Sequence, residues 1–500
     1  MSRIKHKYLC EAPNRAKKHL LPLQHLVFRH HYAMTYKTLE SFLRPRPSDL
    51  ERLAQGKSLR QKVPRSTLAE LPAPTRRQLP IDILRDQAAT RIPELVPIRH
   101  ARMAENPFAF YRGAAAIMAH DLSTLPSPPI QVQLCGDMHV SNFGYFSTAE
   151  RQLVFGINDF DETLPGHFDW DLKRLAASAM IAAESIGQDQ SFGADMIRLI
   201  CTSYRSRMAQ YAKTPYIELS RSYIDQAALL DAANARSPAT LKFIRKQIAR
   251  ARKNTNQGVI AKLTTDTPEG RRLTDYPPFV THHNVTVHGT DIRVVLEAGL
   301  ASYARSLLSD RRHTLMCYRL IDVARKVVGV GSVGTGCWVL YLEGQDESDP
   351  LFLQYKQALP SVLAPYFSDR AFRSQGERVV HGQRLIHGAP DLFLGYGNTR
   401  ETEFYVRQLR DMKGGIAFGE GGIGAAEFPD YARIFGWALA NAHARSGDPA
   451  QLSGYCGQGE QLDDALVKFS MTYAQQNLAD YDTFVKAIKA GKLPCNTDII

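Results

Sequence analysis

Three glycines, Gly329, Gly331 and Gly334, lie between segments that have the composition of β-strands. In a dinucleotide-binding fold, such a G-x-G-x-x-G run opens directly into a helix whose N-terminus meets the pyrophosphate. Here the glycines lead into Cys337–Leu342, where Trp, Val and Tyr favour a strand, and then into a second β-type run, Leu351–Lys356. The order strand, glycine turn, strand, strand argues against a doubly wound nucleotide fold and favours a sheet of adjacent hairpins.

The second β-type run ends with a lysine, Lys356. In kinases, the backbone of a glycine-rich turn covers the ATP phosphates, and a lysine on the third strand pairs with them. Glu377, on the helix predicted over Gly376–His387, is the candidate partner of this lysine. Glycines between strands are most often plain turns, and a lysine at a strand end is most often solvated. The nucleotide-clamp hypothesis therefore depends on what the rest of the chain supplies.

Two loops elsewhere supply the complementary residue types. Asp137 and Asn142 follow the predicted strand Ile130–Cys135, and Asp159 follows the predicted strand Gln152–Ile157. Phosphoryl transfer requires an Asp that accepts a hydroxyl proton, and an Asn and a second Asp that hold Mg²⁺ against nucleotide phosphates. The three residue types occur in that order. Taken together with the glycine turn and the lysine, they favour a phosphotransfer site over coincidence.

The composition narrows the class of protein. The chain has 500 residues, 44% hydrophobic and 22% charged, and no apolar run approaches the roughly 18 residues that span a bilayer. Seven scattered cysteines without a CxxC pair are typical of a reducing compartment, so we expect a cytoplasmic protein without a membrane span. The net charge of +12 favours anionic partners. Nucleic acid is not favoured, because the basic run Lys242–Lys253 lacks interleaved stacking aromatics.

Changes in composition divide the chain into four parts. Residues 1–75 are basic and interrupted by prolines, which predicts a poorly packed leader. Residues 76–310 are mainly helical and hold the catalytic loop, and Asp169 is expected to cap a helix that ends at Glu184. Residues 311–425 form the β-rich nucleotide clamp. Residues 426–500 are predicted to form helices that pack on the catalytic segment.

The motifs resemble two known groups of proteins. Gly136-Asp-x-His-x-x-Asn142, the Asp after a strand, and a helix opened by Asp169-Trp-Asp-Leu172 resemble the protein kinase-like superfamily, most closely its aminoglycoside and choline phosphotransferase branch. Longer stretches, which cover nearly the whole chain after about residue 55, resemble an uncharacterised bacterial family, domain of unknown function 2252. That family implies no activity. The stretches include Glu94–Arg99, Pro107–Gly113, Asn158–Gly166, Asp171–Ala176 and Arg407–Lys413.

The kinase resemblance implies an α+β, two-lobed fold with ATP and Mg²⁺ as cofactors. Asp137 would be the catalytic Asp, and His139 and Asp171 would brace its loop. Asn142 and Asp159 would bind Mg²⁺, and Asp161 would be a second acidic contact. The residues that would hold the triphosphate are Gly329, Gly331, Gly334 and Lys356, and Arg407–Asp411 would lie near the adenine.

The order of these parts departs from the kinase pattern. In kinases the glycine turn and the lysine precede the catalytic Asp, but here they follow it by about two hundred residues. Because a site is defined by geometry and not by chain order, we expect circularly permuted lobes, with a separate β-rich domain as the alternative. The helix that precedes the catalytic loop in small-molecule kinases would be either Tyr431–His443 or Tyr111–Leu122.

The function expected from these features is transfer of the γ-phosphoryl group of ATP to a hydroxyl of a small molecule or protein. Nucleotidyl (AMP) transfer by the same residues and a non-catalytic nucleotide-binding module are alternatives. A third alternative is metal-dependent phosphoester hydrolysis, in which Asp137, His139, Asp159 and Asp161 would ligate the metal, with His282 and His283 as optional further ligands. In the phosphotransferase hypothesis, replacing Asp137 or Asp159 abolishes turnover and leaves the fold intact.

Overall fold

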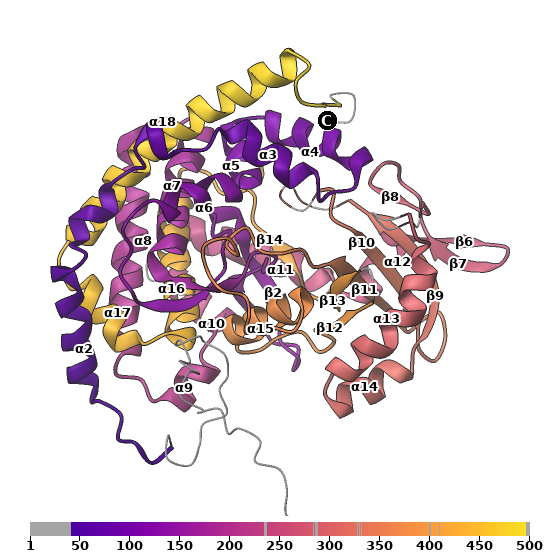
Figure 1. Ribbon diagram of the computed structural model, residues 1–500. Coiled ribbons are helices and arrows are strands. Elements are labelled where there is room, and N and C mark those ends of the chain that lie inside the picture. The colour runs from indigo at the N-terminus through magenta and orange to yellow at the C-terminus, as the bar shows by residue number, and fades with distance from the viewer. Residues whose placement is uncertain are drawn as a thin grey trace, which may run out of the picture.

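The computed structural model describes residues 42–496 except 235–237, 284, 286–288, 328, 330, 332, 400, 401 and 410. Helices and antiparallel strands gather in different regions of the molecule (Figure 1), which confirms the predicted α+β class. We call residues 42–253 and 411–496 the helical part, and residues 256–409 the sheet part.

The helical part contains most of the helices, a short two-stranded ribbon and a small sheet. Its helices are α2 (Asp49–Ser58), α3 (Pro80–Ala88), α4 (Val96–Ala104), α5 (Pro107–Gly113), α6 (Ala115–Ser123), α7 (Phe168–Ser185), α8 (Gln190–Tyr211), α9 (Tyr216–Arg221), α10 (Gln226–Asn234), α11 (Pro238–Lys253), α16 (Phe428–Ser446), α17 (Pro449–Cys456) and α18 (Gln461–Lys489). Its strands are β1 (Gln131–Leu134), β2 (Phe143–Ser147), β3 (Leu153–Ile157), β4 (Leu164–His167), β5 (Ile224–Asp225) and β14 (Gly414–Gly415). They pair in the orders β1-β4 and β14-β2-β3-β5.

Helix α7 is the centre of the helical part. Every residue from Phe168 to Ala183 is buried, because α8 and α18 pack against this helix and strand β1 runs beside it. A helix that is buried all round needs apolar or small residues on every face, and the run Leu175–Ala183 supplies them. The N-cap of α7 is His167 and not Asp169. The predicted capping role of Asp169 is therefore wrong, and its buried carboxylate instead lies 3.3 Å from Lys173 Nζ.

The sheet part is built on six antiparallel strands in the order β12-β13-β11-β10-β9-β8. Its elements are α12 (Asn256–Leu263), β6 (Thr264–Thr267), β7 (Gly270–Leu273), β8 (Val280–Thr281), α13 (Ile292–Ser306), α14 (Ser309–Met316), β9 (Arg319–Lys326), β10 (Cys337–Glu343), β11 (Pro350–Gln357), α15 (Gln375–His387), β12 (Gly395–Asn398) and β13 (Glu403–Gln408). The glycines lie between β9 and β10, and Lys356 lies on β11. The predicted order of strand, glycine turn, strand and strand is confirmed.

The side chains of β10 point alternately to the two faces of the sheet, and each face is covered by other elements. Trp338, Leu340 and Leu342 pack with Ile292 and Leu296 of α13, whereas Val339 and Tyr341 pack with residues of α12 and β7. The elements that cover the sheet thus begin near residue 256. The boundary predicted at residue 311 falls too late, since the helices before it belong with the sheet.

Residues 42–75 also differ from the prediction of a poorly packed leader. Helix α2 has a capping box in which Ser48 Oγ accepts from Glu51 N, and it packs against α17. Leu68 is fully buried in the main core. Residues 1–41, the rest of the predicted leader, lie outside the described residues. None of the helices in the described ranges combines the length and apolar character needed to cross a membrane.

Candidate active site

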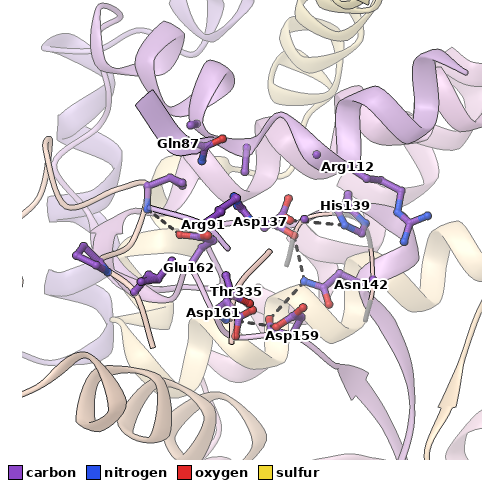
Figure 2. Close-up of a pocket in the computed structure, with 18 of the residues that line it drawn as sticks. Gln87, Arg91, Arg112, Asp137, His139, Asn142, Asp159, Asp161, Glu162 and Thr335 are labelled. Atoms are coloured by element: carbon purple, nitrogen blue, oxygen red, sulfur yellow. Dashed lines mark hydrogen bonds and ion pairs between the residues drawn. The ribbon is translucent and has the colours of Figure 1, made fainter. Parts of the chain in front are cut away.

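A cavity of about 560 Å³ lies where the helical part meets the sheet part. Its walls come from the loop after β1, the loop after β3, the glycine turn between β9 and β10, the segment after β11, and helices α3 to α6. Figure 2 shows Asp137 between Arg91 on one side and His139 on the other, with Asn142, Asp159 and Asp161 nearby. Residues that are about two hundred positions apart in the sequence therefore share one cavity.

Helix α7 positions the loop that carries Asp137 through the side chain of Asp171. The buried carboxylate of Asp171 accepts hydrogen bonds from Cys135 N (2.7 Å) and Gly136 N (3.0 Å), so it fixes the backbone directly before Asp137. Gly136 has a φ of +85°, a conformation that side chains with a Cβ rarely adopt. This bracing role of Asp171 agrees with the role that the sequence resemblance implied.

His139 lies on the same loop, with Nε2 3.7 Å from Asp137 Oδ2. Burial lowers the pKa of this imidazole well below its ordinary value, and repulsion from Arg112 and Arg174 adds to the effect. A neutral ring can orient a neighbouring carboxylate or hydroxyl but adds no positive charge beside it. His139 is therefore suited to a supporting role next to Asp137.

Asp137 itself forms an ion pair that sequence reasoning missed. Arg174 of α7 donates through Nε to Asp137 Oδ1 at 2.7 Å, and its Nη2 also contacts that oxygen. The same guanidinium donates to Tyr111 O (3.1 Å) and lies over the Tyr111 ring. Arg174 thus fixes one oxygen of Asp137, while the other oxygen lies toward His139 and the glycine turn.

Asn142 and Asp159 lie beside this pair and present the ligand atoms that Mg²⁺ prefers. The amide nitrogen of Asn142 donates to Asp137 O (3.1 Å) and Asp159 O (3.3 Å), which directs its amide oxygen away from both carbonyls. The Asp159 side chain also lines the cavity. An amide oxygen and a carboxylate fit a cation that takes one or two protein ligands and completes its shell with phosphates and water. The residues present therefore fit Mg²⁺.

Lys356 does not line the cavity, but it reaches the loop after β3 from the sheet by contacting Asp161. Its ammonium forms a short ion pair with Asp161 Oδ2, and Tyr405 OH donates to Asp161 Oδ1 at 2.7 Å. Burial opposes the charge of Lys356, but attraction to Asp161 outweighs burial and raises the pKa of the lysine. Arg407, which lines the cavity, donates to Asn158 O at 3.2 Å.

The predicted partnership of Lys356 with Glu377 is wrong. The Glu377 carboxylate accepts from Arg373 N (2.7 Å) and Tyr396 OH (3.1 Å), and the residue does not line the cavity. Its neighbour on α15, Arg378, faces the site instead. The buried Arg378 guanidinium donates to Asp161 O (2.8 Å) and to other backbone carbonyls, those of Thr163 (2.6 Å) and Leu359 (2.8 Å).

The glycine turn covers Asp137. Gly329 and Gly331 line the cavity, and a Cβ at Gly331 would lie only 3.8 Å from Asp137 Oδ2. Gly334 does not line the cavity. Its carbonyl accepts from Ile92 N (2.7 Å), while Arg91 Nη1 donates to the carbonyl of the preceding residue at 2.6 Å. The turn is therefore tied to the segment that precedes α4.

The histidines of the phosphoesterase hypothesis lie elsewhere. His282 contacts Asp275 (2.8 Å) and Asp322 (3.1 Å) at the edge of the six-stranded sheet, and neither it nor His283 lines the cavity. Within the ranges that the structure describes, no group of three or more His, Cys, Asp or Glu side chains is placed to hold a metal ion. The ligand set of that hypothesis is not assembled in these ranges.

The two helices proposed to precede the catalytic loop both contact its supports. His443 of α16 lies 3.4 Å from Asp171, whereas Tyr111 of α5 donates its hydroxyl to Arg174 O at 2.7 Å. The segment predicted as one helix over Tyr111–Leu122 is divided between α5 and α6. These contacts do not distinguish the two assignments.

The site residues that the sequence analysis missed are mainly arginines. Arg174, Arg99 and Arg112 lie within stretches already noted as family-like, Asp171–Ala176, Glu94–Arg99 and Pro107–Gly113. The charged residues inside these stretches could therefore have been chosen as candidate site residues from the sequence. Arg91 and Arg378 lie outside the stretches and carried no comparable signal.

Comparison with known proteins adds a family but no activity. No curated protein and no solved structure matches the chain. The model of one bacterial family, described as "Uncharacterized protein conserved in bacteria (DUF2252)", matches residues 91–487, about four fifths of the chain. That range includes each residue of the candidate site described above. The chain belongs to this uncharacterised bacterial family.

Proposed function

We propose that this protein is a Mg²⁺- and ATP-dependent phosphotransferase of kinase-like design, with permuted lobes. The observation that carries the proposal is that the two halves of the motif set meet: Gly329 and Gly331 line the same cavity as Asp137, and Lys356 contacts Asp161 behind the cavity wall. Gly331 lies over Asp137, and Lys356 contacts the loop that bears Asp159. Neither contact follows from proximity in the sequence.

The proposed chemistry assigns each group one task. The acceptor hydroxyl oxygen forms a bond to the γ-phosphorus, the bond to the β,γ-bridging oxygen breaks, ADP leaves, and the hydroxyl proton passes to Asp137 Oδ2. Arg174 holds Asp137 Oδ1, so the free oxygen points at the acceptor. Asn142 and Asp159 would hold Mg²⁺, which neutralises charge on the phosphates. The glycine turn would cover the phosphates from above.

Lys356 is assigned to the phosphates, although its ammonium contacts Asp161 in the structure. A lysine ammonium has three donors, so it can contact a phosphate oxygen while it keeps the carboxylate. Asp161 would then hold the lysine in place, which is the task that the sequence analysis gave to Glu377. With this assignment, replacing Lys356 should abolish nucleotide binding without removing a metal ligand, so the residue separates nucleotide binding from metal binding.

The test is a thermal-shift titration of the full chain with ATP, ADP and GTP, each with and without Mg²⁺. A ligand that binds only the folded state raises the melting temperature by mass action. We expect a Mg²⁺-dependent shift with ATP that disappears in Lys356→Met. Lys468→Met, at an exposed site on α18, is the matched control and should keep the wild-type shift.

A second arm separates the metal from the phosphates. Asp159→Asn should retain the shift with ATP alone and lose the increment that Mg²⁺ adds. Absence of any nucleotide-dependent shift in the wild type would refute the proposal. Once binding is established, the mass of the product distinguishes phosphoryl transfer, which adds phosphate to the acceptor, from nucleotidyl transfer, which adds AMP.

A further inference from the structure

One wall of the cavity carries two buried arginines for which the proposed chemistry has no use. Arg91 precedes the short 3-10 turn Pro93–Leu95, and Arg99 lies on α4. Both line the cavity, yet their exposed fractions are only 8% and 1%. They come from the N-terminal helices, which contribute neither the Asp loops nor the glycine turn.

The hydrogen-bonding capacity of these two side chains is only partly used. Arg99 Nη2 donates to Gly113 O (2.7 Å) and Gln87 Oε1 (3.2 Å), whereas its Nε and Nη1 have no hydrogen-bond partner in the described part of the chain. Arg91 Nη1 donates to the Val333 carbonyl, and its Nε likewise has no partner there. Buried donors left unpaired cost free energy, and more so when they are charged.

Charge compensation at this wall is also incomplete. No carboxylate in the described ranges forms an ion pair with Arg91 or Arg99, although Glu162 lines the same cavity. The Glu162 carboxyl accepts from Val362 N at 2.7 Å, and burial raises its pKa to about 7. Burial lowers the pKa of both arginines, and the charge of Arg91 adds to this effect at Arg99. Attraction to the Glu162 carboxyl partly offsets the lowering of both pKa values, but neither guanidinium has a carboxylate in direct ion-pair contact within the described ranges.

The position of this wall relative to Asp137 shows which ligand it can serve. In Figure 2, Gln87 and Asp159 lie on opposite sides of Asp137. The proposed metal ligands lie on the Asp159 side, whereas the glycine turn contacts Arg91 through the Val333 carbonyl, and Gln87 is a direct partner of Arg99. A molecule that presents a hydroxyl to Asp137 from the Gln87 side would place its remaining groups against Arg91 and Arg99.

We propose that the phosphoryl acceptor is an anionic molecule whose phosphate or carboxylate group binds Arg91 and Arg99 while its hydroxyl faces Asp137. A planar guanidinium offers paired N–H donors that match the oxygens of either group. This inference rests on the proposed function for the identity of the reaction. The anion-binding wall itself is independent of it.

The experiment measures anion binding and nucleotide binding on the same variants. The probes are inorganic phosphate, glycerol 3-phosphate, glycerate and uncharged glycerol, titrated by calorimetry into the full chain. Arg99→Gln removes the charge and keeps a polar amide at this position. Arg85→Gln, which alters an exposed arginine on α3, is the matched control.

We expect glycerol 3-phosphate or glycerate to bind the wild type and Arg85→Gln, and glycerol not to bind. Arg99→Gln should weaken binding of the anion at least about tenfold, because charge-assisted hydrogen bonds are lost. The same variant should bind MgATP as the wild type does, whereas Lys356→Met should no longer bind MgATP but should still bind the anion. Glycerol 3-phosphate and glycerate distinguish a phosphate from a carboxylate preference.

Three results would overturn the inference. If none of the anions binds the wild type, the wall is not an anion site. If Arg99→Gln weakens MgATP as much as it weakens the anion, the arginines serve the nucleotide, and the proposed function survives without this acceptor. If the anion binds but MgATP does not, the acceptor assignment fails together with the proposed function. Arg91→Gln serves as the second variant if Arg99→Gln does not fold.

Discussion

Replacing Asp137 tests both the chemistry of the site and its stability. The sequence alone predicts that Asp137→Ala abolishes turnover and leaves the fold intact. In the structure, however, Asp137 is the ion-pair partner of Arg174, whose side chain is only 3% exposed. Asp137→Ala would leave a buried guanidinium without its counter-charge. We therefore expect the variant to be inactive and also less stable than the wild type.

The expected loss of stability follows from the burial of the pair. Removing one partner of a buried ion pair costs roughly 3–5 kcal/mol, because the remaining charge is left uncompensated. The Asp137 side chain is 20% exposed, so water can enter the space it vacates. Arg174 also keeps its bond to Tyr111 O. We therefore expect the lower end of that range, a loss of about 3 kcal/mol in the free energy of unfolding.

A double variant separates stability from chemistry. Asp137→Ala with Arg174→Met removes the charge together with its partner and should restore stability to within about 1 kcal/mol of the wild type. It should remain inactive. Urea denaturation of the wild type, both single variants and the double variant gives the coupling energy of the pair. The reasoning is wrong if Asp137→Ala is as stable as the wild type, or if the two single losses simply add in the double variant.

Two further predictions concern the turn above Asp137 and a buried histidine below the loop after β3. Gly331→Ala should leave the free energy of unfolding unchanged, because the new Cβ makes only ordinary contacts. It should weaken MgATP binding, because the Cβ narrows the gap between the turn and Asp137. Thermal-shift titration with MgATP measures this effect, and an unchanged affinity would count against the turn covering the phosphates. Burial lowers the pKa of His387 to about 3, so the folded state binds this proton less readily than the unfolded state, and stability falls as the pH drops below about 6.5. Between pH 7 and pH 5 the wild type should lose about 2 kcal/mol more than His387→Gln in urea denaturation, and equal losses would contradict the burial of a neutral ring.

The strands around the glycine turn could be predicted because their signals are local. The short continuous apolar run Cys337–Leu342, with its Trp, Val and Tyr, and the glycines before it specify a strand after a turn, and β10 forms there. Asp137, Asn142 and Asp159 were found for a similar reason, since each follows directly after a short predicted strand. Their convergence with Lys356 was only a hypothesis, because it depends on contacts between distant parts of the chain.

The failures arise where orientation matters more than residue type. Glu377 and Arg378 are adjacent on one helix turn, and a single sequence does not show which of them faces the neighbouring loop. The structure turns Arg378 inward and Glu377 toward Tyr396. Likewise, Asp169 has a good capping side chain, but α7 begins two residues earlier than such a cap requires, with His167 as its N-cap, and buries Asp169 beside Lys173. Local propensity was overruled by packing in both cases.

The bonds between the glycine turn and the segment around α4 also limit how the turn can move. Arg102 of α4 donates to Gly329 O, and Ile92 N donates to Gly334 O, so the turn is fastened near both of its ends. The turn cannot swing open as an isolated flap, since its movement must carry α4 with it or break these bonds. We therefore expect the residence time of a ligand to depend on movement of the segment around α4, and exchange of the Ile92 amide hydrogen with solvent to report each opening.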